Sequence, residues 1–234
     1  MIDFYAVHKL LVWSAAIVLP VAGCLLHYFC FGPHTVSVNQ TAPVTLVRRF
    51  GILEWISHWF ILISFMVLAV TGIMQLVQSI QHPVGPFHGW LGFGFFLVSV
   101  VTLLVWIPDA LFRSVDWQWM RVMGGYLSRN PQPLPSGRFN AGQKIYYWLI
   151  MVVLIGLLVS AIIMEQGSHT LEGRKELFWC IHGLLGCLAT SMVIGHGYLS
   201  LFANPDTARV LWNGRVSKAY IDKYHALWEG GHEP

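Results

Sequence analysis

Long stretches without a charged residue alternate with short charged segments along the chain. Asp, Glu, Lys and Arg are absent from residues 10–47, 55–108, 145–164 and 177–205. A helix needs about 20 apolar residues to cross a hydrocarbon core, and the second stretch is long enough for two, with Pro83 and Pro86 breaking it near its middle. The pattern predicts five membrane spans, at residues 10–31, 55–77, 88–107, 146–164 and 178–202.

Composition points to the same fold class. Of the 234 residues, 56% are hydrophobic and 11% are charged, whereas soluble domains carry about 25% charged residues. The long stretches without charge exclude a soluble enzyme and a disordered chain. The net charge of +3 is too small and scattered for a nucleic-acid-binding protein. We expect an all-α polytopic membrane protein in three parts: an additional N-terminal transmembrane helix and loop at 1–47, a four-helix bundle at 48–204, and a tail at 205–234.

The distribution of Lys and Arg sets the expected orientation. These residues gather at Arg48 and Arg49, in the 109–144 loop and in the tail. The 78–87 turn has none, and the 165–176 loop has two beside three Glu. Cytoplasmic segments carry the excess of Lys and Arg, so the N-terminus is predicted outside and the C-terminus in the cytoplasm.

Three local features bear on processing, metal binding and contacts with the membrane interface. Residues 21–24 resemble a lipoprotein cleavage box, but the apolar run continues to Phe31 and Lys9 is the only Lys or Arg before the box, so we expect a retained span. The four cysteines form no CxxC or CxxCH motif and are expected to be packing residues. Residues 114–127 form either a short interfacial helix or a loop with exposed aromatic side chains.

Histidine carries the candidate chemistry. Six of the eleven histidines are expected outside the membrane: His8, His34, His82, His169, His225 and His232. An ionisable residue at membrane depth is a functional candidate by default, and His182 and His196 lie 14 residues apart in one span. A helix turns about 100° and rises about 1.5 Å per residue, so these two share a face and stand about 21 Å apart along the axis.

Two other histidines match them in depth. His88 begins the third span on the outer side and is expected beside His182; His58 lies near the inner start of the second span and is expected beside His196. Two stacked imidazole pairs suit two bis-histidine haems, whereas other metals need further ligands nearby. His27 has no partner at its depth and is expected to be a packing residue.

Glycines and arginines near these histidines each have two possible roles. Gly92 and Gly186 follow His88 and His182 by four residues and could admit a flat group or serve plain helix packing. Arg48 and Arg49 could neutralise haem propionates or be simple positive-inside charge.

The chain resembles a known family, the membrane-anchoring cytochrome b (gamma) subunits of the respiratory formate dehydrogenase-N type. The resemblance runs from Arg48 to Trp228, and its specific parts are the RFNAGQK segment at 138–144 and the 14-residue histidine spacing. The resemblance also rests on His58 between Ser57 and Trp59, His88 with Gly92, the GRVS segment at 214–217, and His225 with Trp228.

The resemblance implies two b haems and a quinone site. It makes His88 and His182 the iron ligands of the periplasmic-side haem, and His58 and His196 those of the cytoplasmic-side haem. Asn140, Gly142 and Gln143 correspond to the quinone-lining segment, and such a pocket suits amide donors in apolar surroundings. The alternative is a capping box, with Asn140 as N-cap and Gln143 three residues on; both can hold at once.

The expected function is electron transfer within a larger complex. The resemblance implies a multi-pass protein of the bacterial cytoplasmic (inner) membrane, serving anaerobic respiration. It would carry electrons from a periplasmic iron–sulfur (beta) subunit and a molybdenum or tungsten catalytic (alpha) subunit to menaquinone or ubiquinone. The formate site would not lie on this chain, and the oligomeric state of the complex is left open.

Two kinds of alternative stay open. The same dihaem module could serve a hydrogenase or a thiosulfate- or polysulfide-type reductase. A haem-free transporter or assembly factor is the alternative of a different class, although its proton relay would call for membrane carboxylates that the spans lack. The family has four spans rather than five, and the turn at Pro86–His88 also departs from its pattern, which places the partner subunits in question.

Overall fold

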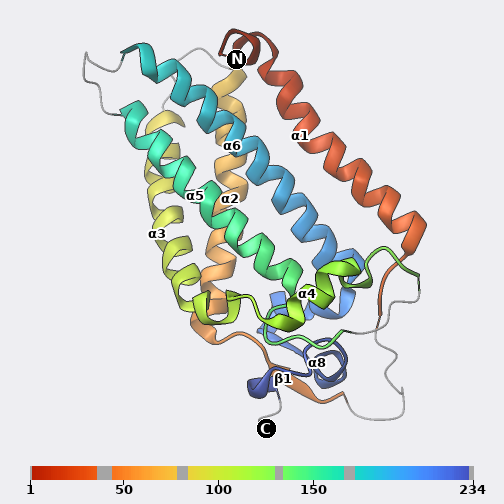
Figure 1. Cartoon of the computed structure of the whole chain (residues 1–234). Helices are drawn as coiled ribbons and strands as arrows, with labels where there is room; N and C mark the ends of the chain where they lie inside the picture. Colours follow the sequence, from red (N-terminus) through yellow and green to blue (C-terminus); the bar gives the residue numbers. More distant parts are fainter. Residues whose placement is uncertain (1, 36–43, 78–83, 130–133, 166–171, 232–234) are drawn as a thin grey trace.

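The computed structural model describes all residues except 1, 36–43, 78–83, 130–133, 166–171 and 232–234. Five long helices make up most of the described chain. They are α1 (Ile2–Phe31), α2 (Ile52–Val77), α3 (Val84–Ala110), α5 (Ala141–Glu165) and α6 (Glu172–Tyr198). All five are long and apolar enough to cross a membrane. The predicted all-α polytopic fold is therefore confirmed (Figure 1).

The helices begin earlier than the charge-free stretches suggested. At α2, the backbone N–H of Gly51 donates to the Glu54 carboxylate over 2.6 Å, so the charged residue belongs to the first turn. At α5, Asn140 caps a helix that starts at Ala141 rather than near residue 146. A capped first turn accommodates polar residues that a hydropathy pattern assigns to the loop.

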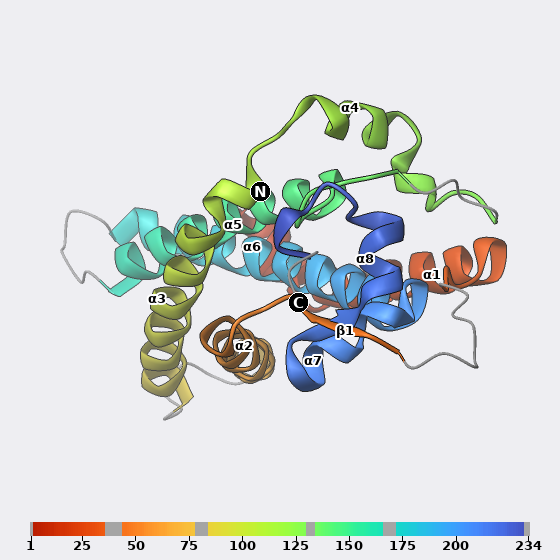
Figure 2. The ribbon, with the colours of Figure 1, turned by 90° about the horizontal axis from the view of Figure 1, so that it is seen from below.

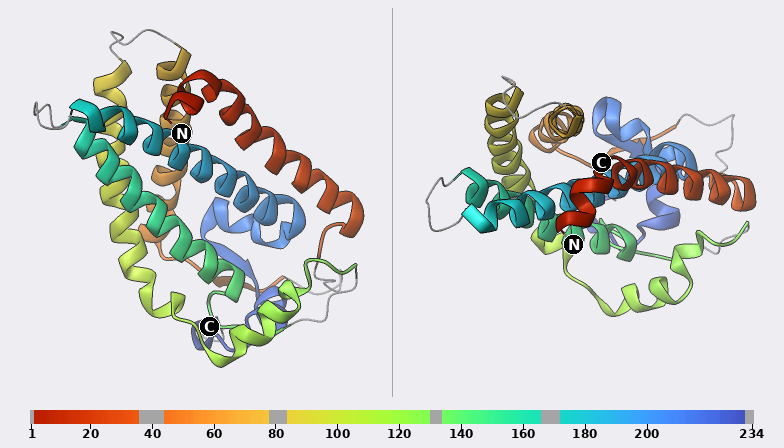
Figure 3. Two further views of the ribbon diagram at one scale, coloured as in Figure 1. Left: turned by 45° about the horizontal axis from the view of Figure 1, so that its top comes forward. Right: turned by 90° about the horizontal axis from the view of Figure 1, so that it is seen from above.

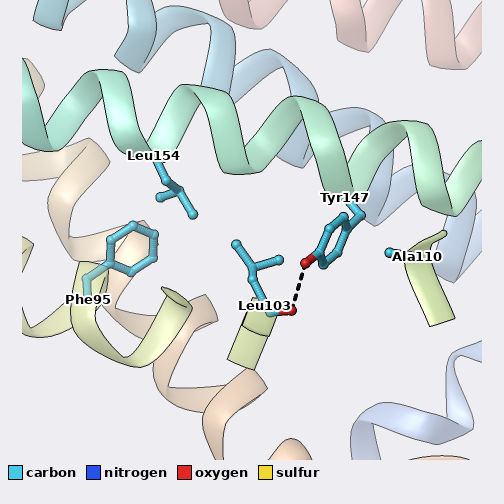
Figure 4. Close-up of a cluster of buried hydrophobic side chains, with 5 residues drawn as sticks. All are labelled: Phe95, Leu103, Ala110, Tyr147 and Leu154. Carbon is cyan, nitrogen blue, oxygen red and sulfur yellow. Dashed lines mark hydrogen bonds between the residues drawn. The ribbon is translucent and has the colours of Figure 1, made fainter. Parts of the chain in front are cut away.

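In the part of the chain that the structure describes, the helix α6 packs closely against α1 and α5 but not against α2 and α3. Close backbone packing joins α2 to α3, α3 to α5, α5 to α6 and α6 to α1, whereas within the described residues α6 approaches α2 and α3 at few points. The helices α3 and α5 enclose an apolar core whose members are Phe95, Leu103, Ala110, Tyr147 and Leu154 (Figure 4). Within it, the Tyr147 hydroxyl donates to the Leu103 carbonyl over 2.7 Å.

The additional helix α1 lies along α6 (Figure 3). Its buried side chains Tyr5 and Trp13 fill the space over two glycines of α6: a Cβ on Gly183 would lie 1.9 Å from the Tyr5 hydroxyl oxygen, and one on Gly186 would lie 3.2 Å from the Trp13 ring. Small residues allow membrane helices to approach closely. Gly186 therefore serves helix packing against α1.

One end of the bundle carries the short elements, and we call it the tail end (Figure 2). The strands β1 (Leu46–Arg48) and β2 (Arg215–Ser217) pair antiparallel there, with Val47 opposite Val216. Beside them lie α4 (Ser114–Arg121), α7 (Arg209–Asn213) and α8 (Lys218–Tyr224), together with short turns at Met123–Gly125, Leu199–Ala203, Pro205–Thr207 and Glu229–Gly231. The left-handed turn before β2 requires Gly214 (φ 68°), where a Cβ would meet the Phe50 carbonyl at 2.8 Å.

The segment that sequence left open as helix or loop contains the helix α4. It lies across the start of α5, where Asp116 and Lys144 form a buried ion pair at 2.8 Å. Lys144 also donates to the Leu111 carbonyl over 2.9 Å. On the other side of α4, Trp117 is exposed, as suits an aromatic side chain at the membrane interface.

Candidate functional site

The structure brings together the two histidine pairs expected from depth. His88 of α3 faces His182 of α6 with ring centres 6.3 Å apart, and we call these the outer pair. His58 of α2 faces His196 of α6 with ring centres 6.5 Å apart at the tail end, and we call these the inner pair. His58, His88 and His182 are partly exposed and His196 is exposed, so none of the four residues is fully enclosed by the chain.

The separation within each pair has a chemical meaning. A metal–imidazole nitrogen bond is about 2 Å long, so a metal ion held between two imidazoles separates their ring centres by about 6 Å. Among the described residues, no three His, Cys, Asp or Glu side chains gather as a metal site. Pairs without a third protein ligand fit a haem iron, because the macrocycle supplies the other four ligands.

Hydroxyl groups orient both rings of the outer pair. Thr71 Oγ1 lies 2.8 Å from Nδ1 of His88, and Ser160 Oγ lies 2.9 Å from Nδ1 of His182. Each hydroxyl has one proton and donates it to a carbonyl of its own helix, Val67 in one case and Gly156 in the other. Each therefore accepts from the imidazole Nδ1–H, which leaves Nε2 unprotonated and able to bind a metal.

A tyrosine ring orients part of the inner pair. Tyr146 of α5 stacks on His196 with ring centres 4.9 Å apart and planes inclined by 18°. Tyr146 lies one turn after Gln143, so the segment that resembles the quinone site of the family adjoins the inner pair. Neither the hydroxyls of the outer pair nor this tyrosine was singled out from the sequence.

The predicted capping box at the start of α5 is confirmed. The backbone N–H of Gln143 donates to Asn140 Oδ1 over 2.9 Å, and that of Asn140 donates to Gln143 Oε1 over 3.0 Å. Because the cap uses the amide oxygens, the amide N–H groups are the ones that can face a ligand. At Gly142 a Cβ would lie 2.5 Å from the Trp119 ring, so close packing of α4 explains this glycine.

A buried polar cluster surrounds the cap at the tail end. Tyr126 receives a hydrogen bond from Asn204 over 3.3 Å and has Asn140 as a further partner. Burial raises the pKa of Tyr126 to about 12 and also raises the pKa of Tyr220, so both phenols stay protonated. A small cavity of about 20 Å³ lies among these residues and Tyr224, and it is large enough for about one water molecule.

His225 is a buried histidine that was expected in an external segment. It is fully buried, and its Nδ1 lies 2.7 Å from the Gly137 carbonyl and 3.1 Å from Ser136 Oγ. Burial and the nearby Arg49 lower its pKa well below the ordinary value. A neutral ring anchored by the 136–137 backbone holds the tail against the segment that precedes α5.

Several buried polar atoms have no hydrogen-bond partner, and most of them lie at the tail end. Among the described residues they are Arg138 Nε, Tyr224 Oη and His225 Nε2 at this end, and Ser99 Oγ in α3. Buried polar atoms normally find a partner in the protein, in water or in a ligand.

The remaining histidines serve other roles or lie outside the described residues. His27 hydrogen-bonds to the Tyr198 hydroxyl (2.6 Å) and to the Tyr126 carbonyl (2.8 Å), which ties α1 to α6. His34 hydrogen-bonds to the Ser128 carbonyl over 3.0 Å. The predicted positions of His82, His169 and His232 fall in segments outside the described residues.

Comparison with known proteins fits this arrangement. A family model described as prokaryotic cytochrome b561 matches residues 49–214, which include both histidine pairs and the cap of α5. The chain belongs to the prokaryotic cytochrome b561 family. A cytochrome b carries haem b, so haem b is the cofactor of this chain, and the spacing of the histidine pairs fits it.

Curated relatives of this cytochrome b561 chain are subunits of formate dehydrogenases. The cytochrome b556(Fdn) subunit of the nitrate-inducible formate dehydrogenase of Escherichia coli (strain K12) is 21% identical over 196 residues, which cover 78% of this chain and 90% of the relative. A formate dehydrogenase cytochrome b556 subunit of Haemophilus influenzae is 24% identical, covering 74% and 78%. The cytochrome b556(fdo) subunit of E. coli K12 is 24% identical, covering 78% and 91%. The resemblance seen in the motifs is thus confirmed.

Proposed function

We propose that this protein is the dihaem cytochrome b subunit of a respiratory formate dehydrogenase. It would carry electrons from a periplasmic iron–sulfur subunit, fed by a molybdenum or tungsten subunit, to a quinone at the tail end. The observation that carries the proposal is the presence of two imidazole pairs with ring centres 6.3 and 6.5 Å apart. The relatives, which are formate dehydrogenase subunits, favour formate dehydrogenase over a hydrogenase or a sulfur-compound reductase.

In this proposal the four histidines bind haem iron. His88 and His182 would hold the outer haem through Nε2, which their Nδ1 hydrogen bonds leave free. His58 and His196 would hold the inner haem. When bound, a haem supplies one-electron transfer at a potential that axial ligands and surroundings set. The hydroxyls and the tyrosine orient the imidazole rings. Because α6 carries one histidine of each pair, 14 residues apart, the two haems would be held at different depths.

The quinone would bind beside the start of α5. The amide group of Gln143 has its oxygen engaged with the Asn140 backbone and its nitrogen available as a donor to a quinone carbonyl. Asn140 is nearly buried among the tyrosines of the tail-end cluster, and Gly142 admits the Trp119 ring that closes this side. Menaquinone and ubiquinone both present the carbonyl oxygens that such donors bind.

The orientation follows from Lys and Arg counts. We infer that the protein lies in the bacterial cytoplasmic membrane with the tail end inside, because the 109–144 segment and the tail hold most of the Lys and Arg residues. The N-terminus of α1 is then periplasmic. Protons consumed in quinone reduction would come from the cytoplasm.

Purification of the intact complex through a tag on this chain tests the proposal. We expect a molybdenum- or tungsten-containing subunit and an iron–sulfur subunit to co-purify, haem b to be reduced by formate without oxygen, and an added menaquinone analogue to reoxidise it. Reduction by hydrogen or a sulfur compound, but not by formate, would assign the chain to another oxidoreductase. A folded preparation without haem b would overturn the proposal.

The hydroxyl partners of the outer pair give a site-specific prediction. Thr71→Val and Ser160→Ala each remove the acceptor for a ligand Nδ1–H while leaving the histidine in place. Loss of such an orienting group typically weakens metal binding about 10–100-fold, so we expect lower occupancy and an altered spectrum of the outer haem alone. Haem titration and low-temperature difference spectra measure both.

A hydroxyl elsewhere in the same bundle provides the control. Thr190→Ala removes a hydroxyl of α6 that donates to the Gly186 carbonyl and touches neither pair, so the haem spectra should stay unchanged. An outer-haem occupancy and spectrum in Thr71→Val and Ser160→Ala identical to the wild type would show that these hydroxyls do not orient the ligands.

A further inference from the structure

Two adjacent arginines that look equivalent in the sequence have opposite environments. Arg48 ends β1 and is exposed, whereas Arg49 is only 4% exposed and points inward at the tail end. Simple positive-inside charge explains an exposed arginine, because it stays hydrated. It does not explain a buried guanidinium, whose desolvation is costly unless a partner carries the opposite charge.

The acceptors around Arg49 are all neutral. Its guanidinium donates to the Arg138 carbonyl over 2.8 Å and to Gln143 Oε1 over 3.4 Å, and it hydrogen-bonds to the Tyr220 side chain. No carboxylate of the described residues lies within 4.0 Å of it. Burial and the neighbouring Arg138 lower its pKa, yet an arginine stays charged at neutral pH.

The two acidic groups that line a cavity together with Arg49 are engaged elsewhere. Arg138 pairs with Glu54 over 2.7 Å and with Asp109 over 3.0 Å, so both carboxylates are bonded to one guanidinium. Arg138 also donates to the backbone carbonyl of Arg49, which fixes the backbone at Arg49. Arg49 is therefore held in place by neutral groups with its charge uncompensated by direct contact.

A cavity of about 650 Å³ opens at this point. Four arginines line it, together with the two carboxylates that Arg138 binds: Arg48, Arg49, Arg138, Arg215, Glu54 and Asp109. Glu54 lies one helical turn before His58, and Gln143, which Arg49 contacts, lies one turn before Tyr146 stacked on His196. The cavity thus adjoins α2, which carries His58, and Arg49 in its wall contacts the helix α5 whose Tyr146 stacks on His196. Its lining has an excess of positive charge.

We infer that Arg49 binds a propionate carboxylate of the inner haem. The inference rests on the proposed haem ligation by His58 and His196. A permanently buried guanidinium calls for a permanent anion, and a haem propionate is one, whereas a resting quinone is neutral and leaves the charge uncompensated. The planar guanidinium matches a carboxylate in two parallel charge-assisted hydrogen bonds.

Spectroelectrochemical titration of the intact complex tests this role. Removing a positive charge beside a haem favours its oxidised form. Arg49→Gln should therefore lower the equilibrium constant for reduction of the inner haem about tenfold, which lowers its reduction potential by about 59 mV for one electron. The outer haem, near the far end of α6, should keep its potential. Arg48→Gln is the matched control and should move neither haem by a comparable amount, because Arg48 is hydrated.

Arg49→Lys separates charge from fold. The lysine keeps the positive charge but loses the planar guanidinium with its two parallel donors. The reduction potential of the inner haem in Arg49→Lys should therefore lie closer to the wild-type value than in Arg49→Gln. If Arg49→Gln loses the inner haem, retention of that haem by Arg49→Lys supports the inference, and loss in both variants indicates a structural role and overturns it.

The remaining outcomes also decide the question. An unmoved inner-haem potential in Arg49→Gln, or an equal shift in Arg48→Gln, overturns the inference. An unmoved potential combined with a raised quinone KM would assign Arg49 to the quinone instead and likewise overturn it. Failure of the proposed function itself is distinguishable, because the wild type would then lack two haems before any arginine is changed.

Discussion

Replacement of His196 by alanine is expected to leave one haem b on the chain, the outer one. The substitution removes one of two axial ligands of the inner haem, and no other described histidine lies within reach of His58. Quinone reduction should fall to background, while formate oxidation with an artificial acceptor continues, because in the proposed complex formate is oxidised on another subunit. A pyridine-haemochrome assay and quinone-dependent activity measure the two effects.

His27 provides the matched control for this substitution. It is also a histidine of a membrane helix, but its partners are Tyr198 and the Tyr126 carbonyl. His27→Ala should weaken the attachment of α1 and retain both haems. Retention of two haems in His196→Ala would contradict the ligand assignment.

Replacement of Asp116 by alanine is expected to destabilise the protein by about 3–5 kcal/mol, because it leaves a buried charge unpaired. The side chains of Asp116 and Lys144 are 2% and 3% exposed, and Asp116 also accepts from the Arg113 backbone N–H over 2.6 Å. The loss should release α4 from the start of α5. Thermal unfolding in detergent, followed by tryptophan fluorescence, measures the change.

A second substitution, at Lys144, tests whether the unpaired charge causes the loss of stability. Lys144→Met in the Asp116→Ala background removes the unpaired cation and should recover part of the lost stability. Lys218 and Asp222 form an exposed pair at 3.3 Å, and Asp222→Ala should cost less than about 1 kcal/mol. Equal destabilisation by Asp116→Ala and Asp222→Ala would show that burial of the first pair has no energetic consequence.

Span number and histidine pairing could be predicted because both follow from the membrane. Lipid requires long runs without charge, so the five helices appear directly in the sequence. Depth places His88 and His182 on the same level once the direction of each span is known. Charge-free stretches alone place the helix starts too late, because Glu54 lies inside the first turn of α2. At α5 the capping box of Asn140 and Gln143 marks the start that hydropathy misses.

Contacts set by tertiary packing were not predictable from periodicity. Thr71 and Ser160 lie in apolar helices, where a hydroxyl bonded to its own backbone is ordinary, and only the packing of α2 and α5 beside the histidines gives them a second partner. Likewise, the burial of Arg49 depends on the pairing of β1 with β2, two segments almost 170 residues apart. No local pattern distinguishes Arg49 from Arg48.

The additional helix α1 illustrates the same limit. Its length and apolarity predicted a span, but its position along α6 depends on Gly183, whose missing side chain admits Tyr5. A glycine in a membrane helix indicates that another helix packs closely against it, but the sequence does not show which helix. The relatives cover about four-fifths of the chain, and the matched family region begins at residue 49, after this helix.

Haem content is the most direct test of the central claim. A pyridine-haemochrome assay of the detergent-purified protein, normalised to polypeptide by amino-acid analysis, should give two haem b per chain, and a reduced-minus-oxidised spectrum should show both. Two haems are what the two imidazole pairs predict. One haem would remove the ligand role from one pair, and a folded protein without haem would contradict the account as a whole.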